Sequence, residues 1–431
     1  MPRTTHGVSM KVRPASRLVW ILLSLAGLLL LAPASRAASL LQDFLRAQAN
    51  DPVYAGALAE NDIGLLQARM ASFAYFPEGR ISSSQLDNES GSRVTVALNQ
   101  PLLSYDRWLM LKEVDPRLAL TAARLEQSQN DLAGRLLKAV SAWAEAREKL
   151  ALNRANIEAL ATQAQSARRS FELGMGTITD VRDTEVRLAQ ARSQSFALDA
   201  ALGAARRQYA ALVGDPGPAE GYVLTEALPV ATLPPLRELL AQASERNATI
   251  RAGVQSAVVA EVGVRRARAA LYPTVTFAAQ RSQISGRDPI SNSGVALRLE
   301  MPLAAGTYFR TATAAVELRR VEEQVRTQKQ QVSLEVERLY EQVRAAESEL
   351  ASRREAIRAA ELSLDANQQS FKGGFRSRVD VLNALQSVFQ AKADYSSALL
   401  RLGEAWAQLR LLAAFDIEST LKQLETFVFK R

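Results

Sequence analysis

The sequence has 431 residues, 48% of them hydrophobic, with 53 basic and 45 acidic side chains, one histidine and no cysteine. Without cysteine the chain can form no disulfide, thiol nucleophile or Cys-ligated zinc site, and its only histidine, His6, lies in a segment that we expect to be removed. We therefore predict that the protein is not an enzyme and holds no metal or cofactor.

Residues 1–37 have the features of a secretory signal peptide. Residues 1–17 are basic and contain no acid, residues 18–32 are uncharged, and Ser35 and Ala37 supply small side chains at both positions that a signal peptidase reads. The uncharged run is shorter than the ~20 residues of a transmembrane helix. Cleavage after Ala37 removes five basic residues and no acids, so the formal charge falls from +8 to +3.

The rest of the chain reads as two tandem repeats, residues 38–235 and 236–415, followed by a short tail, 416–431. Phe171–Val181 matches Phe371–Val381 at an offset of 200 residues. Two further landmarks match in the same order, Ala74–Pro77 with Ala270–Pro273 and Leu98–Leu102 with Leu299–Leu303. Three ordered matches indicate a duplication. The sequence suggests no role for the tail.

Each repeat contains a strand pair, at about 72–102 and 272–303, and a long helical hairpin, at about 105–213 and 305–413. The helical stretches lack proline after Pro116 in the first repeat and after Pro302 in the second, and they are rich in strong helix formers. Glycines at 174, 176, 373 and 374 mark the turns of the two hairpins. A helix from about 305 to 371 would be about 100 Å long and must pack along other helices.

The predicted strands alternate between apolar and polar residues. Val94, Val96 and Leu98 share one face, and Thr95, Ala97 and Asn99 share the other. Residues 294–301 repeat the pattern, with Val295, Leu297, Leu299 and Met301 opposite Arg298 and Glu300. Four strands cannot enclose a lumen, because closed barrels begin at about eight. Either the strands form a small sheet, or several chains pool them, and three chains would supply twelve.

This arrangement closely resembles the TolC-like outer-membrane efflux proteins. The resemblance rests on the export signal, the duplicated strand pair and hairpin, and the turn at 174–181. It implies a mainly α fold with a membrane β-barrel contribution: a homotrimer whose twelve strands form one outer-membrane β-barrel joined to a long periplasmic α-barrel. Asn50–Tyr54 is similar to the branch associated with type I protein secretion.

The resemblance also implies a function and partners. The protein would be the outer-membrane exit duct of a tripartite export system in a Gram-negative bacterium, extending into the periplasm. A periplasmic adaptor and an inner-membrane ABC or proton-driven pump would deliver the substrate, and outer-membrane lipid would surround the duct. Among possible cargoes, Asn50–Tyr54 favours secreted protein over drugs.

In this family the hairpin tips dock the adaptor and form the gate. Arg376 matches an arginine that holds the closed tip through a carboxylate on the other hairpin, here Asp180, and Asp380 matches an acid that rings the aperture. Two positions depart from the pattern and predict a looser or less charged gate: Phe371 replaces a tyrosine and Asn383 replaces a second acid. The docking positions are Leu173, Gly174, Thr177, Ile178, Thr179, Gly374 and Val379.

Other interpretations remain open at this point. Asp180 and Asp380 could cap the returning helices, a role compatible with gating. An interfacial aromatic girdle could be formed by Phe73, Tyr75, Phe76 and Tyr272, or these side chains could simply pack where the sheet and the helices meet.

For the whole chain, two other functions are possible. A periplasmic adaptor would have one hairpin and more strand, and a structural coiled coil would not explain the strands. A nucleic-acid binder is disfavoured because acids and bases interleave along an exported chain.

Overall fold

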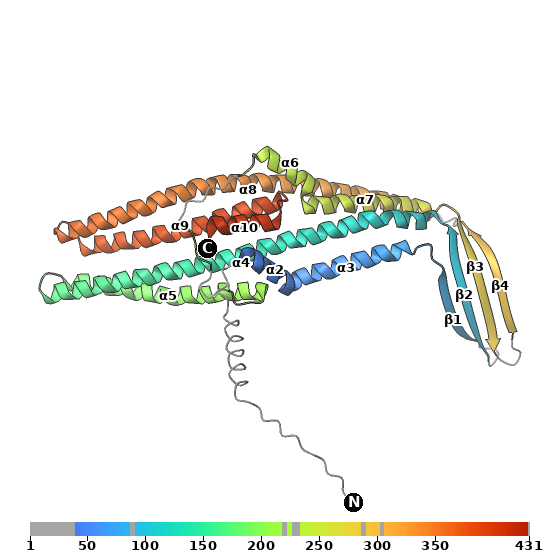
Figure 1. The fold of residues 1–431 in the computed structure, drawn as a ribbon, viewed down its shortest axis with the longest axis horizontal. Helices are drawn as coiled ribbons and strands as arrows, with labels where there is room; N and C mark the ends of the chain where they lie inside the picture. Colours follow the sequence, from blue (N-terminus) through green and yellow to red (C-terminus); the bar gives the residue numbers. More distant parts are fainter. Residues whose placement is uncertain are drawn as a thin grey trace, which may run out of the picture. The chain divides into compact units, whose positions relative to one another are not determined.

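The computed structural model describes residues 39–86, 91–217, 222–225, 233–285, 290–301 and 306–429 (Figure 1). The predicted signal peptide and Pro302 lie outside these ranges. None of the helices in the described part combines the length and the apolar character needed to cross a bilayer. The mainly α fold is confirmed, with one small sheet.

Each repeat opens with a pair of helices. The first repeat has α2 (Leu40–Asn50) and α3 (Pro52–Ser72), and the second has α6 (Leu236–Arg246) and α7 (Ala248–Ala269). In both, a single capping residue separates the two helices, Asp51 in the first repeat and Asn247 in the second. The duplication seen in the hairpins therefore extends to these helices.

The four strands form one antiparallel sheet in the order β1-β2-β3-β4. They are β1 (Glu78–Leu86), β2 (Gly91–Leu103), β3 (Thr274–Ser285) and β4 (Ile290–Glu300). The two repeats meet where β2 pairs with β3, and β1 and β4 are the edges.

Four long helices make the two hairpins. The first hairpin is α4 (Tyr105–Glu172) with α5 (Ile178–Val213), and the second is α8 (Gly306–Lys372) with α9 (Arg378–Leu412). At a rise of about 1.5 Å per residue, each first helix is about 100 Å long. The sheet lies at one end of these helices and the two hairpin turns lie at the other (Figure 1).

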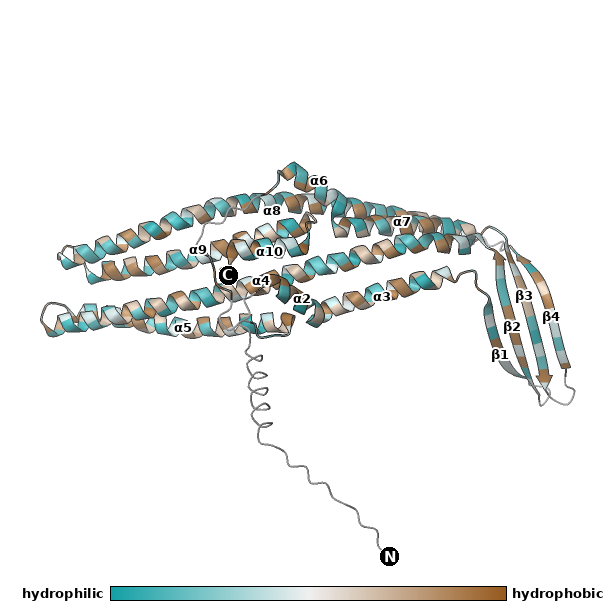
Figure 2. Cartoon of the chain, viewed as in Figure 1, coloured by the Kyte–Doolittle hydropathy of each residue, from teal (hydrophilic) through white to brown (hydrophobic). Residues whose placement is uncertain are grey.

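The core is thin and follows the contacts between helices. Apolar and polar residues alternate along each rod, as Figure 2 shows, because each helix packs on neighbours along narrow stripes. One cluster joins both hairpins, with Leu160 and Ala191 from the first and Leu382 and Leu385 from the second. The hairpins therefore pack on each other.

The tail forms a helix that packs on the middle of the molecule. Helix α10 (Ile417–Val428) lies against α9 and α2, where Gly403 lies so close to Val428 that a side-chain carbon there would clash. Glu425 accepts a hydrogen bond from the backbone N–H of Leu40 at 3.2 Å. The last described helix thus caps the first.

Candidate functional site

The two hairpin turns have the same backbone construction. Gly174 and Gly374 both adopt the left-handed region, at φ 69° and 78°, where a side chain would strain the backbone. In each turn the next residue donates its N–H to a serine carbonyl, Met175 to Ser170 at 2.8 Å and Phe375 to Ser370 at 2.9 Å. The turns are thus equivalent 200 residues apart.

Both predicted gate aspartates begin the returning helices. Asp180 accepts hydrogen bonds from the Thr177 N–H and hydroxyl at 3.2 and 2.8 Å, and the Asp180 N–H donates back to Thr177. Asp380 forms the same capping box with Ser377. These bonds from Ser377, helped by the nearby charge of Arg376, hold the pKa of Asp380 below its usual value. The capping role is therefore present in the fold.

The predicted gate pair is not formed inside one chain. Among the ion pairs of the described residues, none joins Arg376 to Asp180. Arg376 is exposed beside the second turn, so it remains available to a neighbouring molecule. The predicted pairing of Arg376 with Asp180 of the other hairpin therefore stays a prediction.

The two departures from the family pattern have partners of their own. The Arg378 guanidinium lies over the Phe371 ring at 4.7 Å, and Arg378 is buried and reaches Gln163 of α4 at 3.5 Å. Asn383 accepts a hydrogen bond from Arg187 of α5 at 2.7 Å. Asn383 therefore connects α9 to the first hairpin directly, and Phe371 contacts the Arg378 side chain that reaches it, neither of which the sequence indicated.

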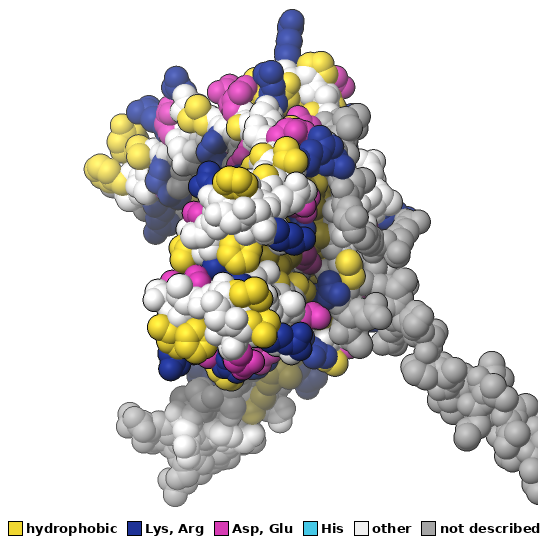
Figure 3. Space-filling model, turned by 90° about the vertical axis from the view of Figure 1, so that its left-hand side faces the viewer, with side chains coloured by type: hydrophobic (Ala, Val, Ile, Leu, Met, Phe, Trp, Pro, Cys, Tyr) yellow, Lys and Arg dark blue, Asp and Glu magenta, His cyan; other side chains and the backbone are white. Residues whose placement is uncertain are grey.

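The docking residues lie on an exposed apolar end. Figure 3 views the molecule from this end, where hydrophobic side chains lie among basic and acidic ones. Leu173 and Ile178 are exposed, as are Thr177 and Thr179, whereas Val379 is half-buried. Met175 and Phe375 are 74% and 88% exposed at equivalent positions, although the sequence analysis did not select them. Their shared 200-residue offset was the signal that could have found them.

At the opposite end, the sheet has one apolar face. The register places Val96 beside Ile81 on β1 and beside Arg281 on β3, and places Phe277 beside Leu297. The predicted alternation on β2 and β4 is thus confirmed, and most apolar members of the four strands lie on one side, together with Arg281, whereas Ile284 and Ile290 lie on the other. These members are exposed: Ile81, Val94, Val96, Leu98, Phe277, Val295, Leu297 and Leu299. Polar residues such as Thr95 and Ser282, which lie within 3.5 Å, occupy the other face.

The Asn50–Tyr54 segment is a structural joint. The Asn50 amide donates to the carbonyls of Ala211 and Leu212 at the end of α5. Asp51 caps α3 through the Tyr54 N–H at 2.8 Å and accepts two bonds from Arg135 at 2.7 and 2.9 Å. These bonds from Arg135, together with those from the backbone, keep the pKa of Asp51 below its usual value.

A buried carboxylate lies beside this joint. Asp43 accepts hydrogen bonds from the hydroxyls of Tyr209 and Tyr222, and Arg46 lies 3.4 Å from it. Burial, with the negative charge of Asp43, raises the pKa of both tyrosines, so their hydroxyls stay protonated and donate. The cluster ties α2 to α5 and to the linker after it.

The family model described as outer membrane efflux protein matches residues 46–215 and 239–414, one segment in each repeat. The chain belongs to the outer membrane efflux protein family. Its resemblance to TolC-like proteins is thereby confirmed, and it is an outer-membrane protein and not an enzyme.

Three relatives of this efflux family show the range of its members. The alkaline protease secretion protein AprF of Pseudomonas aeruginosa is 27% identical over 92% of this chain and 89% of its own length. The proteases secretion protein PrtF of Dickeya chrysanthemi is 27% identical over 77% and 74%. The outer membrane protein TolC of Vibrio cholerae is 20% identical over 91% and 96%.

A solved structure from the same family shares the fold. The outer membrane protein VceC of Vibrio cholerae superposes with a TM-score of 0.72 at 16% identity, over 87% of this chain and 96% of VceC. At this identity the likeness concerns the fold alone.

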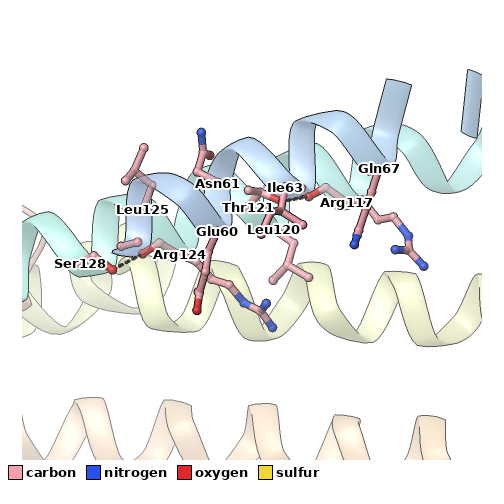
Figure 4. A pocket seen from close by; sticks show the side chains of 12 residues that line it. Glu60, Asn61, Ile63, Gln67, Arg117, Leu120, Thr121, Arg124, Leu125 and Ser128 are labelled. Carbon is pink, nitrogen blue, oxygen red and sulfur yellow. Dashed lines mark hydrogen bonds between the residues drawn. The ribbon is translucent and has the colours of Figure 1, made fainter. Parts of the chain in front are cut away.

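One groove of this efflux protein lies between α3 and α4 (Figure 4). Gly64 allows the two helices to approach closely, because a side-chain carbon there would lie 2.6 Å from the Thr121 hydroxyl. Thr121 and Ser128 donate to carbonyls of their own helix, at Arg117 and Arg124. Within the described residues no group of three or more metal-ligating side chains occurs, in this groove or elsewhere.

Proposed function

We propose that this protein is the outer-membrane exit duct of a tripartite export system and that it works as a homotrimer. The observation that carries the proposal is the sheet, whose two edges, β1 and β4, are unpaired and whose apolar face is exposed on every strand. Exposed strand edges have unpaired backbone hydrogen-bonding groups and an exposed apolar face is unfavourable in water, so both are expected to contact another chain or lipid. One chain has too few strands to close a ring around a lumen. Three chains would close twelve strands, edge to edge, with the apolar face toward lipid.

The same arrangement would give the duct a wet interior. Thr95, Asn99 and Ser282 lie on the face opposite the apolar one. In a closed ring this polar face lines the passage, and the hairpins continue it away from the membrane. Substrates then pass without covalent chemistry, which suits a site without histidine or cysteine.

The hairpin tips would dock a periplasmic adaptor and narrow the duct. Exposed apolar residues at both turns offer a contact surface, and the aspartates and Arg376 offer charge at the aperture. In a trimer, Arg376 of one chain would pair with Asp180 of its neighbour, and three copies of Asp380 would attract cations. An inner-membrane pump, either an ABC transporter or a proton-driven one, would complete the pathway.

Secreted protein is the cargo that we favour. AprF and PrtF, two relatives at 27% identity, are described as secretion proteins for proteases. The Asn50–Tyr54 segment adds little to this assignment, because its side chains act as a joint between helices. Co-purification with a pump would identify the cargo class: an ABC transporter supports protein secretion, and a proton-driven pump contradicts it.

The trimer is tested by cysteine cross-linking, which is unambiguous because the chain has no cysteine of its own. Ser82→Cys on β1 is combined in turn with Asn292→Cys, Gly294→Cys and Ala296→Cys on β4, which the register places on the same polar face as Ser82. We expect one of these pairs to give a covalent trimer in isolated outer membranes. Monomers only, across all three pairs, would contradict a shared ring of strands. Ser352→Cys with Ser82→Cys is the control, because α8 and β1 are far apart along the rods.

The gate is tested by single-channel conductance in planar bilayers. Removing either partner of the predicted pair, by Arg376→Ala or Asp180→Ala, should raise the conductance because the closed tip loses a contact between chains. Lys329→Ala, an exposed lysine in the middle of α8, serves as the control. Unchanged conductance in both tip variants would remove the gate proposal and leave the aspartates as helix caps.

A further inference from the structure

Aromatic and basic side chains recur together where each helix meets the sheet. Arg69 precedes Phe73 by four residues at the end of α3, and Arg268 precedes Tyr272 by four after α7. On α4, which runs away from the sheet, Trp108 precedes Lys112 by four. At the start of α8, Phe309 and Arg310 are adjacent. All eight side chains are exposed.

The four basic residues have no acidic partner in the described part of the chain, whereas the nearest acids are engaged. Asp106 and Glu113 are held by Arg266, at 2.9 and 3.2 Å, and Glu78 is held by Arg107 at 2.7 Å. Asp115, which is exposed, lies about a turn further from the sheet than Lys112. The junction therefore presents free positive charge.

One of these positions is a concave site. It is lined by Tyr75, Leu103, Tyr105, Trp108, Tyr272 and Pro273. Tyr105 stacks on Trp108 with ring centroids 5.7 Å apart and lies against Tyr272 at 5.3 Å. The Lys112 ammonium lies 5.5 Å from the centre of the Trp108 ring.

The site is continuous with the apolar face of the sheet. Leu103 pairs with Val275, which lies on the same face as Phe277 and Leu297. Lys112 is four residues along α4 from Trp108, so its Cα lies about 6 Å further along the helix, away from the sheet. From the sheet towards the helices, a bound molecule would therefore contact the apolar strands, then the aromatic rings and then the Lys112 ammonium.

We infer that this site binds an anionic phospholipid of the leaflet that faces the helices. An acyl chain would lie on the apolar face, the glycerol region against Tyr105 and Trp108, and the phosphate beside Lys112. Tryptophan and tyrosine rings prefer this depth of a bilayer, and a lysine near an anionic headgroup strengthens binding about fivefold. A protein partner would leave the apolar face of the sheet uncovered. The inference rests on the proposed function, because it needs the sheet to lie in the membrane.

Trp108 provides a direct probe. Of the tryptophans in the described residues, Trp143 and Trp406 are 3% and 4% exposed, whereas Trp108 is 45% exposed. The purified trimer is placed in vesicles of phosphatidylcholine with a small fraction of brominated phosphatidylglycerol or of brominated phosphatidylcholine. Bromine quenches tryptophan that it touches. Heat-resistant trimer on a gel, measured on the same samples, reports assembly.

We expect brominated phosphatidylglycerol to quench at a concentration about fivefold lower than brominated phosphatidylcholine does. Lys112→Gln should abolish that preference and keep the quenching, and Trp108→Phe should abolish the quenching. Lys329→Gln, which removes an exposed lysine far from the sheet, should behave as the wild type.

Equal quenching by both lipids in the wild type would overturn the anionic site while leaving the duct intact. Absence of quenching in an assembled trimer would show that a neighbouring chain covers Trp108, and this also overturns the inference. Loss of the trimer itself would count against the proposed function instead. Each result thus bears on one of the two claims.

Discussion

The two repeats build the same joint between helices from different side chains. In the first repeat, Asn50 binds the end of the returning helix α5, and Asp51 caps α3 and holds Arg135. In the second repeat, Asn247 does both tasks: its oxygen accepts from the Thr249 N–H at 2.9 Å, and its nitrogen donates to the Leu412 carbonyl at 2.8 Å. The joint therefore needs an acceptor for one helix and a donor for another, and one residue or two can supply them.

This comparison also explains a sequence signal. Asn50–Tyr54 stands out in the sequence by its similarity to the type I secretion branch, whereas the structure shows that Asn50 and Asp51 hold helices together. The counterpart of this segment in the second repeat is the single residue Asn247, and one asparagine is too common in sequences to be recognised as a motif. Duplicated backbones thus keep their hydrogen bonds more faithfully than their residues.

The largest expected effect is at the charged joint. Asp51→Ala removes the cap of α3 and leaves Arg135 without its partner, so it should lower the free energy of unfolding by about 2–3 kcal/mol. This is less than for a fully buried pair, because Arg135 is 38% exposed. Asn247→Ala should cost about 1–2 kcal/mol, since no ion pair is lost. Thermal unfolding of the trimer measures both.

Asp51→Asn separates the cap from the charge, because the amide oxygen can still accept from Tyr54. The pKa of Asp51 is lowered in the folded protein, so its charge stabilises the fold above the usual value near 3.8 and this contribution is lost as the pH falls through the folded pKa. The wild type should therefore lose its advantage over Asp51→Asn below about pH 3.8. An advantage that is independent of pH would contradict the ion-pair account.

The glycines test whether the two tips are equivalent. Gly174→Val and Gly374→Val each place a β-branched residue at positive φ, which should cost about 1–2 kcal/mol and distort the turn. We expect each variant to form trimers and to lose cross-linking to the adaptor. Gly134→Ala is the control, because Gly134 lies inside α4 next to open space and alanine favours helix there. Cross-linking that persists in both valine variants would exclude the tips as the docking surface.

The contact between hairpins should have a smaller effect on stability. Arg187→Ala removes the bond to Asn383, and because the pair is exposed the cost should be about 0.5 kcal/mol. Its consequence should appear in the conductance, which rises if the two hairpins separate more easily. Arg182→Ala, on the same helix but paired with Glu185 of its own turn at 2.9 Å, is the matched control. Equal conductance in both variants would show that the Arg187 contact does not restrain the tip.

The smallest effect concerns the charge that distinguishes the tips. Arg376 lies beside Asp380, whereas Gly176 occupies the equivalent position before Thr177. The pKa of Asp380 is lowered mainly by Ser377, so its stabilisation of α9 is present above the usual value near 3.8 and disappears as the pH falls through the folded pKa. The melting temperature of Asp380→Asn should approach that of the wild type as the pH falls below about 3.8. A difference that stays constant as the pH falls would contradict the assignment.

The sequence predicted the features that depend on local patterns. Positive φ at Gly174 and Gly374, the capping aspartates and the alternation on β2 and β4 are written in residues close together in the chain. The predicted repeat boundaries and the predicted gate roles of the tip residues stay predictions.

Features that depend on how rods pack could not be predicted in this way. Arg378 could have been a solvated arginine, and only the packing of α9 on α4 places it over Phe371. Asn383 suggested a weaker gate when read alone, but its partner Arg187 is 196 residues away. When polar residues occur all around a helix, the sequence does not show which side of the helix faces its neighbour. The partners of side chains on different helices can therefore be identified only in the structure.

The hydrogen bond between Glu425 and Leu40 joins the last described helix to the first, so it can form only late in folding. In an exported chain α2 crosses the inner membrane first and α10 last, so the first backbone N–H of α2 has no acceptor until nearly the whole polypeptide has crossed. Phe429, which bridges to Leu224, arrives later still. A copy that ends anywhere before α10 would lack both contacts, so the first backbone N–H of α2 would stay without this acceptor and Leu224 without its bridge.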